Sequence, residues 1–570
     1  MLKKHVIVEL RVPRKLHPKK WMEEAKRYLH KKYGFKLDLK YFPRRSAFFK
    51  KFADELKQKE ELLIFVRGKI RKEHLQKLRA LEKVAAIWSD PRIRVFDYPC
   101  GETQQSSPCR STCYTLSSAK GTLEDVISHL DAKWVWAQNQ KGQGVVIGVC
   151  DTGVMQSWIG VERFQTKPNS TEIDGWTSED YQGLDASPGS DLARYPHGTS
   201  LAYDLLHICP EAKILDIGLF KPDKPFEALL SDAEVALDWA IEHYQDPTLQ
   251  GPHVILCSWG MVRKDDIPPD PTGESPNYAD NPDHPFTRTV QRAIAAGILV
   301  CFAAGNCGEV NPTPYCGSVS EGNIGPNQSI WGANGHEAVI CVGAATTENV
   351  WVGCSSQGPS ALGAEKPDVV APSDFQGFIS CDRGTSTANA ILAGVLGLLK
   401  GAIPDLQQDE ARDVLICTAT DVCGPGWNPQ GGNGMINAKA ALTELWRKRG
   451  QQPPDPNPPN LDEIDGYNPP EPPIIKGPCS ITTATGNPHS IMNPQIQYLR
   501  EYRDDVILQS NFSSTFKRLE DIYYRLSSSF AMKMKKSSVV RKIVSVFVVF
   551  PFIGLVKGLL SLKLSLRKSG

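Results

Sequence analysis

The chain of 570 residues is too long for one compact domain, and with 41% hydrophobic and 23% charged residues it is too apolar to be disordered. Its formal net charge of +1 conceals an uneven distribution. Residues 1–97 carry 28 Lys+Arg and 12 Asp+Glu, residues 98–450 carry 22 and 42, and residues 451–570 carry 15 and 10. The basic front and the acidic middle should attract each other within one chain. A nucleic-acid partner is not expected, because the basic segment lacks interleaved aromatics and a known binding motif.

The first segment, residues 1–98, is expected to form a small α+β (ferredoxin-like) domain because strand and helix patterns alternate along it. The strand patterns are at 5–12, 35–42, 61–68, 85–90 and 92–98, and the helix patterns are at 21–34 and 72–84. The first residues, MLKKHVIVELRVPRK, lack the uninterrupted apolar stretch of a signal peptide, so we expect a cytoplasmic protein.

The middle of the chain changes pattern after a Ser, Thr, Gly and Pro-rich linker or processing region at 99–120. From 121 to 447, continuous apolar strands such as GVVIGVCD and GILVCFAAGN alternate with helical stretches. This pattern predicts an α/β domain with a doubly wound, mostly parallel sheet that is covered by helices on both faces. The clearest helical stretches are 227–244, 286–296 and 386–401.

The end of the chain begins with a proline-rich linker at 451–478 and continues as a tail, 479–570, with a helical, amphipathic middle. Its apolar run at 543–556 has fourteen residues, fewer than the roughly 20 that span a bilayer. From Lys533 onward there are nine Lys+Arg and no acid. Two interpretations stay open: contact of 533–570 with an anionic membrane surface, or a buried or partner-binding helix.

The cysteines are expected to be mostly reduced core thiols and not a disulfide framework. The chain has 15 of them, an odd number. Four lie in apolar runs that resemble buried strands, namely Cys150, Cys257, Cys301 and Cys341. Cys109 and Cys113 could share a metal, but no second ligand pair with suitable spacing follows, so no metal site is predicted.

Three segments carry the residue types of nucleophilic catalysis, in which a serine hydroxyl needs a base beside it and a group that orients the base. Asp151 ends an apolar strand in VVIGVCDTGV, and His197 precedes a helical pattern in YPHGTSLAYDLL. Ser386, in DRGTSTANAI, stands where a long apolar helix begins, so backbone N–H groups should point at developing negative charge. Asn306, at the strand end LVCFAAGN, would supply a second donor to the oxyanion.

Seven short motifs stand in the order and spacing of the subtilisin-like serine peptidases, and about 320 residues of the chain resemble that family. They are DTG, HGT, SWG (258–260), AAGN (303–306), SSQGP (355–359), KPDVVAP (366–372) and GTS (384–386). The resemblance implies a subtilisin-like fold and a serine endopeptidase in which Asp151 orients His197 and His197 takes the proton of Ser386. The Ser386 N–H and Asn306 would form the oxyanion hole.

The same resemblance implies how a peptide or protein substrate is held, without a cofactor. The edge strand that pairs with an extended substrate would be Ser258, Trp259 and Gly260. The first specificity pocket would be walled by Ala303, Ala304 and Gly305. Calcium is common in the family, but the stretch between HGT and CPEAKILDI is short and no site is identified.

The N-terminal segment resembles the subtilisin propeptide, which assists folding and then blocks the active site. The resemblance implies an autoinhibited precursor in which this domain is an intramolecular inhibitor, and the opposite charges of the two segments support docking independently. We expect removal of the residues up to a point between 98 and 120. The tail, with CSITTATGNP and then QIQYLREYRDDVIL, resembles the CFI-box module of some bacterial proteins, with Ser480 in place of its phenylalanine. A bacterial origin is therefore expected.

Two departures from the family pattern affect the expected chemistry. Ser200 replaces the second histidine of HGTH, so any helper role of that side chain is lost. In GTSTANAI, Ala390 and Ile391 replace the usual proline and histidine, and less crowding near Ser386 would let amines compete with water, giving transpeptidation. A second class of function, a catalytically silent binding protein that kept the fold, is the alternative to an active peptidase.

Overall fold

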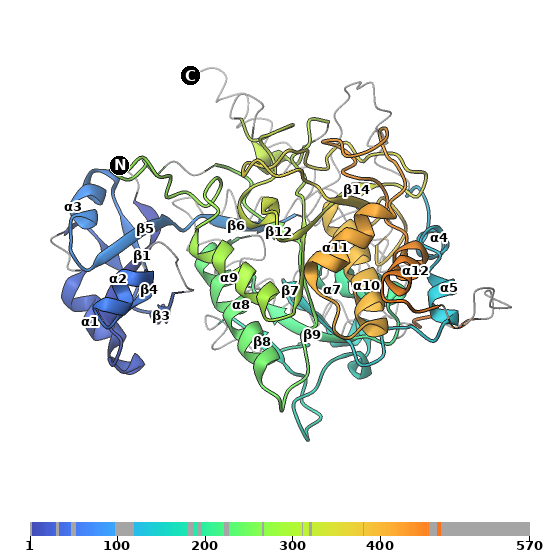
Figure 1. Ribbon diagram of the computed structural model, residues 1–570, viewed down its shortest axis with the longest axis horizontal. Helices are drawn as coiled ribbons and strands as arrows, with labels where there is room; N and C mark the ends of the chain where they lie inside the picture. The colour runs from blue at the N-terminus through green and yellow to red at the C-terminus, as the bar shows by residue number, and fades with distance from the viewer. Residues whose placement is uncertain are drawn as a thin grey trace, which may run out of the picture. The chain divides into compact units, whose positions relative to one another are not determined.

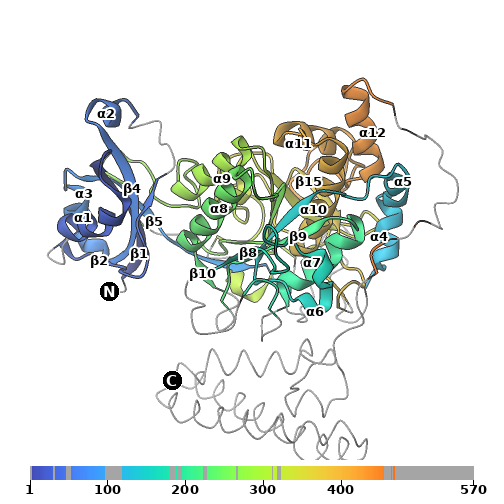
Figure 2. The same cartoon turned by 90° about the horizontal axis from the view of Figure 1, so that it is seen from below.

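The computed structural model describes residues 3–468 with several gaps, and Figures 1 and 2 show their arrangement from two directions. The residues left out within this range are 30–32, 47–52, 97–118, 179–186, 191–195, 222–226, 265–266, 311, 318–321, 380, 453, 455–463 and 465. Most of the predicted linker at 99–120 and the whole predicted tail at 479–570 therefore lie outside the described residues. Within them, no helix is both long and apolar enough to span a membrane.

The N-terminal segment forms an antiparallel sheet in the order β2-β4-β1-β5, with β3 also paired to β4. The strands are β1 (Lys4–Pro13), β2 (Lys36–Leu37), β3 (Arg44–Arg45), β4 (Glu61–Ile70) and β5 (Val84–Ser89). The helices are α1 (Trp21–Tyr28), α2 (Ala53–Gln58) and α3 (Leu75–Arg79). The segment combines strands and helices, while its assignment as a ferredoxin-like domain stays a prediction.

The two faces of this sheet have different neighbours, which follows from the two-residue period of β1. Val6, Val8 and Leu10 pack into a core with residues of α1 and α3. Ile7, on the opposite face, packs in a second cluster that includes Val235 of the middle segment. The N-terminal unit therefore uses one face for its own core and the other for the rest of the protein.

The last predicted strand of the N-terminal domain, at 92–98, pairs elsewhere, so this part of the interpretation is wrong. The strand β6 (Arg92–Val95) lies between β10 (Ala228–Leu229) and β12 (Trp259–Gly260) in a separate three-stranded antiparallel sheet. Its side chains do not reveal this, because Ile93 and Val95 are apolar and would suit either sheet. They are fully buried against residues of the middle segment.

The middle segment contains a seven-stranded sheet in the order β15-β14-β13-β11-β7-β9-β8, and every pair in it is parallel. The strands are β7 (Val146–Asp151), β8 (Gly175–Thr177), β9 (Lys213–Gly218), β11 (Val254–Cys257), β13 (Leu299–Ala303), β14 (Ile340–Ala345) and β15 (Val369–Pro372). Continuous apolar strands indicate such a sheet because both faces are buried.

Helices cover both faces of the sheet (Figure 1). One core contains α7 (His197–Ile208) and α10 (Thr385–Ala402), and the opposite core contains α8 (Leu230–Gln245) and α9 (Pro285–Ala295). Strand residues alternate between them: Ile147 faces the first and Val146 the second. The remaining helices are α4 (Leu123–His129), α5 (Ala132–Ala137), α6 (Gln156–Ile159), α11 (Gln408–Cys417) and α12 (Ala438–Lys448). The sheet and these two layers confirm the predicted mostly parallel α/β architecture.

The proline-rich segment after α12 is not wholly a free linker, although 451–478 is predicted to be one. Tyr467 is only 4% exposed, and its hydroxyl donates to the carbonyl oxygen of Ile159 at 2.8 Å. Its ring packs edge-on against His207 of α7. Tyr467 therefore helps to anchor this segment to the α/β domain, together with Ile464, which packs against the same core.

The cysteine prediction is confirmed for the four core thiols and is incomplete elsewhere. Cys150, Cys257, Cys301 and Cys341 are buried and free. Cys307 and Cys316 form a disulfide, which the sequence pattern does not indicate, since the two lie in a loop without a repeated spacing. Cys109 and Cys113 lie outside the described residues.

Candidate active site

Asp151 and His197 meet at the carboxyl end of the parallel sheet. Asp151 is the last residue of β7 and is fully buried, and His197 is the first residue of α7. The His197 Nδ1 and the Asp151 Oδ1 are 2.8 Å apart. The Asp151 Oδ1 also accepts from the Thr152 N–H at 2.7 Å, so the carboxylate is held in one orientation. Gly198 permits this approach, because a Cβ there would lie 2.7 Å from the Gly153 carbonyl oxygen.

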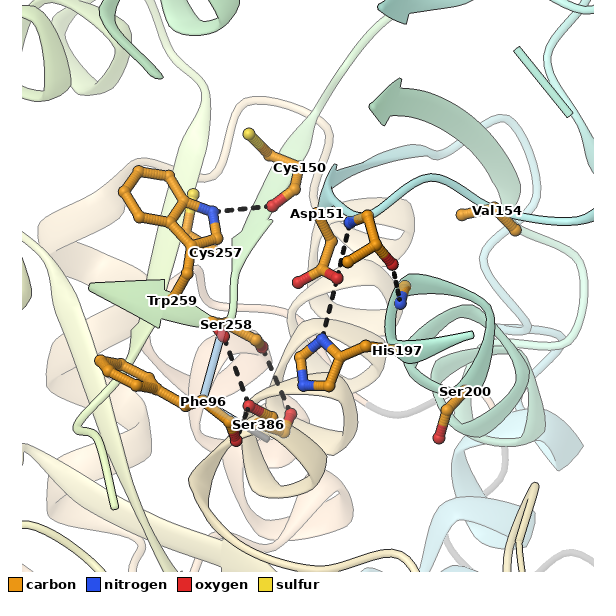
Figure 3. A network of polar contacts seen from close by, with 12 residues as sticks. Phe96, Cys150, Asp151, Val154, His197, Ser200, Cys257, Ser258, Trp259 and Ser386 are labelled. Atoms are coloured by element: carbon orange, nitrogen blue, oxygen red, sulfur yellow. Dashed lines mark hydrogen bonds and ion pairs between the residues drawn. The ribbon is translucent and has the colours of Figure 1, made fainter. Parts of the chain in front are cut away.

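Ser386 is the second residue of α10 and is 2% exposed. The helix follows Gly384, whose φ of +83° is readily adopted only by glycine. Figure 3 shows the imidazole of His197 between Asp151 and Ser386. The Ser386 hydroxyl donates to the carbonyl oxygen of Phe96 at 2.9 Å. The three residues that the sequence indicates for nucleophilic catalysis are thus brought together from three separate elements.

Asn306 follows β13 and is fixed by the residue that precedes Ser386. Its Oδ1 accepts from both the N–H and the Oγ1 of Thr385, each at 3.0 Å. The amide group therefore turns its Nδ2 toward Ser386, where it donates to the Phe96 carbonyl oxygen at 2.8 Å. One carbonyl oxygen thus receives hydrogen bonds from both Asn306 and Ser386.

Phe96 is the last residue described before the gap at 97–118, and its main chain is bound as an extended peptide. Its N–H donates to the Ser258 carbonyl oxygen at 3.0 Å. The preceding residue Val95 lies opposite Trp259 in the antiparallel β6–β12 pair. The predicted edge strand at 258–260 does pair with an extended segment, and that segment belongs to this chain. We call these contacts of Phe96 with Ser258, Asn306 and Ser386 the Phe96 site; Figure 3 shows Phe96, Ser258 and Ser386.

The Phe96 ring is 3% exposed and fills a space that exists because two of its walls are glycine. A Cβ on Gly260 would lie 2.7 Å from the ring Cζ, and one on Gly305 would lie 3.3 Å from it. Asn334 connects the two segments that contain these glycines. Its Nδ2 donates to the carbonyl oxygens of Trp259 at 3.0 Å and Ala303 at 2.9 Å. Ala304 is buried beside them in the same core. Of the predicted first-pocket residues, Gly305 lies against the Phe96 ring, while the pocket role of Ala303 and Ala304 stays a prediction.

Three residues of the site are absent from the predicted set. They are Phe96, Asn334 and Asn389. The Asn389 Nδ2 donates to the Cys257 carbonyl oxygen at 3.0 Å. Asn389 stands one turn after Ser386, and a polar residue within the apolar helix pattern of 386–401 is a signal that could have found it. Phe96 and Asn334 carry no such local signal, since their roles depend on partners far away in the sequence.

Ser200, which replaces the second histidine, donates from its hydroxyl to the Asp382 Oδ1 at 2.9 Å. Asp382 and Asp204 are both buried, and Asp204 stands one helical turn after Ser200. Burial raises the pKa of Asp382 to about 7, and the nearby charge of His197 opposes this. Burial and the neighbouring Asp382 raise the pKa of Asp204 well above its usual value. Among the described residues, no three His, Cys, Asp or Glu side chains gather as metal ligands would.

The two substitutions that suggested transpeptidation, Ala390 and Ile391, are fully buried in the core formed with α7 and the sheet. Ala390 stands one helical turn after Ser386 in α10. Transpeptidation stays a prediction.

Comparison with known proteins gives a family match over the middle of the chain. A sequence model described as the subtilase family matches residues 142–434, about half of the chain. Serine protease AprX of Bacillus subtilis is 25% identical over 337 residues, which cover 53% of this chain and 67% of AprX. Subtilisin DY of Bacillus licheniformis is 27% identical over 319 residues, which cover 55% of this chain and 96% of subtilisin DY.

Among solved structures, fervidolysin from Fervidobacterium pennivorans aligns with a TM-score of 0.47 and 17% identity, covering 78% of this chain and 61% of fervidolysin. The residues matched by the family model include Asp151, His197, Asn306 and Ser386. On this match, the chain belongs to the subtilase family of serine-type peptidases.

Proposed function

We propose that this protein is a serine endopeptidase made as an autoinhibited precursor, and that its first substrate is its own Phe96–Asp97 bond. One observation carries the proposal. The Phe96 carbonyl oxygen accepts from Asn306 Nδ2 at 2.8 Å and from the Ser386 hydroxyl at 2.9 Å. A carbonyl held by an amide donor against a serine is the arrangement that acyl transfer requires.

In the proposed reaction, the Ser386 hydroxyl rotates from the carbonyl oxygen toward His197 and attacks the carbonyl carbon. His197 takes the hydroxyl proton at Nε2, while Asp151 holds the Nδ1 proton and stabilises the imidazolium. Negative charge develops on the carbonyl oxygen and is stabilised by Asn306 and by the Ser386 N–H at the start of α10.

The second half of the reaction reverses these roles. The C–N bond breaks as His197 returns its proton to the leaving amine, which gives an acyl ester on Ser386. Water then loses a proton to His197 and attacks the ester, and the carboxylic acid leaves as Ser386 regains its proton. Every proton transfer uses a group of this chain or the water that is consumed.

Substrates are proposed to bind as β6 does, extended between β10 and β12. Main-chain hydrogen bonds supply the generic part of the recognition, because any extended peptide offers them. The Phe96 ring supplies the specific part: it is enclosed beside Gly260 and Gly305, so we propose a preference for a large aromatic residue before the cleaved bond. The proposed maturation site, after Phe96, precedes the range between 98 and 120 that the sequence suggests.

A fluorophosphonate probe tests the activity, since it labels only a serine that a neighbouring base activates. The processed protein should be labelled more strongly than the unprocessed precursor, in which β6 covers Ser386, and Ser386→Ala should abolish the label. Ser329→Ala is the matched control, because Ser329 is buried and its hydroxyl donates to the Gly325 carbonyl oxygen at 2.8 Å, outside the proposed site. A folded protein that is neither processed nor labelled would favour a catalytically silent binding protein.

A further inference from the structure

The strand β6 shows where the side chains of a bound peptide go, not only its main chain. Successive side chains of an extended strand point to opposite sides, so Arg94 and Phe96 share one side and Val95 points to the other. Val95 is fully buried, whereas Arg94 is partly exposed. The side chain two residues before Phe96, which is the third residue before the proposed cleaved bond, therefore reaches a part of the surface that the first pocket does not include.

The Arg94 side chain ends on an aromatic ring. Its guanidinium carbon lies 4.3 Å from the centroid of the Tyr315 ring, well inside the roughly 6 Å at which a cation and a ring face attract each other. A guanidinium is planar and weakly hydrated, and this makes it the side chain best suited to stack on such a face.

Tyr315 is held in place relative to Asn306. It lies in a short 3-10 helix (Pro314–Cys316) at the end of the loop that the Cys307–Cys316 disulfide closes. At the start of this helix, the N–H of Thr313 donates to the Asn306 carbonyl oxygen at 3.0 Å. From the outer side, Arg263 donates to the carbonyl oxygen of Tyr315 at 3.3 Å. The ring is thus fixed to the same loop that presents the oxyanion donor.

We propose that Tyr315 forms a binding subsite for a cationic side chain at the second residue before the cleaved one, so that this peptidase prefers peptides with arginine there. The inference rests on the proposed function, because it assumes that substrates follow the path of β6. It adds the chemical class of a second recognised side chain, and it names a residue that the sequence patterns do not indicate.

The test uses two internally quenched peptides that contain the chain's own sequence Ile-Arg-Val-Phe-Asp-Tyr, residues 93–98. In the second peptide citrulline replaces arginine, which removes the charge and keeps the shape. The processed full-length protein should cleave the arginine peptide with a kcat/KM about two- to fivefold higher, the size expected of one exposed cation–π contact. Tyr315→Ala should reduce this ratio to about one, and Tyr315→Phe, which keeps the ring face, should retain most of it.

Titration of active sites with the fluorophosphonate distinguishes failure of the Tyr315 subsite from failure of the proposed function. If the enzyme is labelled and cleaves both peptides equally, or if Tyr315→Ala keeps the full ratio, the subsite is refuted and the proposed function stands. If neither labelling nor cleavage occurs, the proposed function itself is refuted.

Discussion

The N-terminal domain contacts the rest of the protein over two surfaces that use different chemistry. Over the first, which we call the helix surface, side chains of the N-terminal sheet meet α8 and α9. Arg67 pairs with Asp232 at 2.5 Å, and Glu9 pairs with Arg288 at 2.5 Å. At the Phe96 site, in contrast, it is the main chain of Phe96 that is bound: its N–H donates to the Ser258 carbonyl oxygen, and its carbonyl oxygen accepts from the side chains of Asn306 and Ser386.

On the proposed function, this difference would separate recognition of the inhibitory N-terminal domain from recognition of substrates. The helix surface requires particular charged side chains, so it selects this one domain. The Phe96 site requires little more than an extended peptide with a suitable ring, so other chains could replace β6 there. The Arg67–Asp232 pair follows the basic character of residues 1–97 and the acidic character of residues 98–450, whereas the Glu9–Arg288 pair has the reverse signs.

The largest expected effect comes from breaking the helix surface. Glu9 is fully buried, and its carboxylate also accepts from the Trp88 Nε1 at 2.8 Å. In the unprocessed Ser386→Ala chain, Glu9→Gln should lower the free energy of unfolding by about 3–5 kcal/mol, because the buried Arg288 loses the charge of Glu9. Denaturant unfolding measures this.

The exposed pair Arg92–Glu227 is the matched control, with side chains 67% and 43% exposed. Glu227→Gln should cost no more than about 1 kcal/mol. Equal losses for Glu9→Gln and Glu227→Gln would show that the helix surface does not depend on its buried charges.

The next effect concerns the Phe96 site alone. Asn306→Ala should lower kcat on a peptide by about 10²- to 10³-fold, the loss known when an oxyanion donor is removed from subtilisin. In the Ser386→Ala chain, Asn306→Ala should lower the free energy of unfolding far less than Glu9→Gln does. Steady-state kinetics with titrated active sites measures the first quantity, and an unchanged kcat would remove Asn306 from the proposed mechanism.

A smaller effect is a dependence of docking on pH, which we expect at the helix surface. Asp90 caps α8, accepting from the Ser231 N–H at 2.9 Å, and burial raises its pKa to about 7. Burial also raises the pKa of Glu234, in α8, to about 7. Both carboxyls should titrate near 4 once exposed. Between about pH 4 and pH 7 the docked state therefore binds more protons than the undocked state. Docking should weaken as the pH rises through this range, and it should change little above about pH 7.

Asp90→Asn tests this dependence, because asparagine keeps the cap and cannot ionise. The free energy of unfolding of the Ser386→Ala chain, measured from pH 5 to 8, should fall with pH less steeply after the substitution. Parallel curves for the two chains would show that Asp90 does not take up a proton on docking.

The regular architecture could be predicted from the sequence because it depends on local periodicity. The helical patterns at 227–244, 286–296 and 386–401 correspond to α8, α9 and α10 with shifts of a few residues at their ends. Asp151, His197 and Ser386 could be found because each stands at the end of such an element, where a parallel sheet gathers its functional residues.

What the sequence could not indicate depends on pairing at a distance. The pattern of β6 is the same whether it pairs within its own domain or with β12, so its partners and the position of Phe96 stayed hidden. Asn334 and Tyr315 lie in loops without periodicity, and their roles come only from the groups that the fold brings to them. The same holds for the Cys307–Cys316 disulfide.

Intact-mass and N-terminal sequencing of the purified full-length protein test the central claim most directly. The account predicts a processed species that begins at Asp97 and is absent from the Ser386→Ala protein. A wild-type protein that still begins at Met1, or is cut elsewhere while Phe96–Asp97 stays intact, would contradict it.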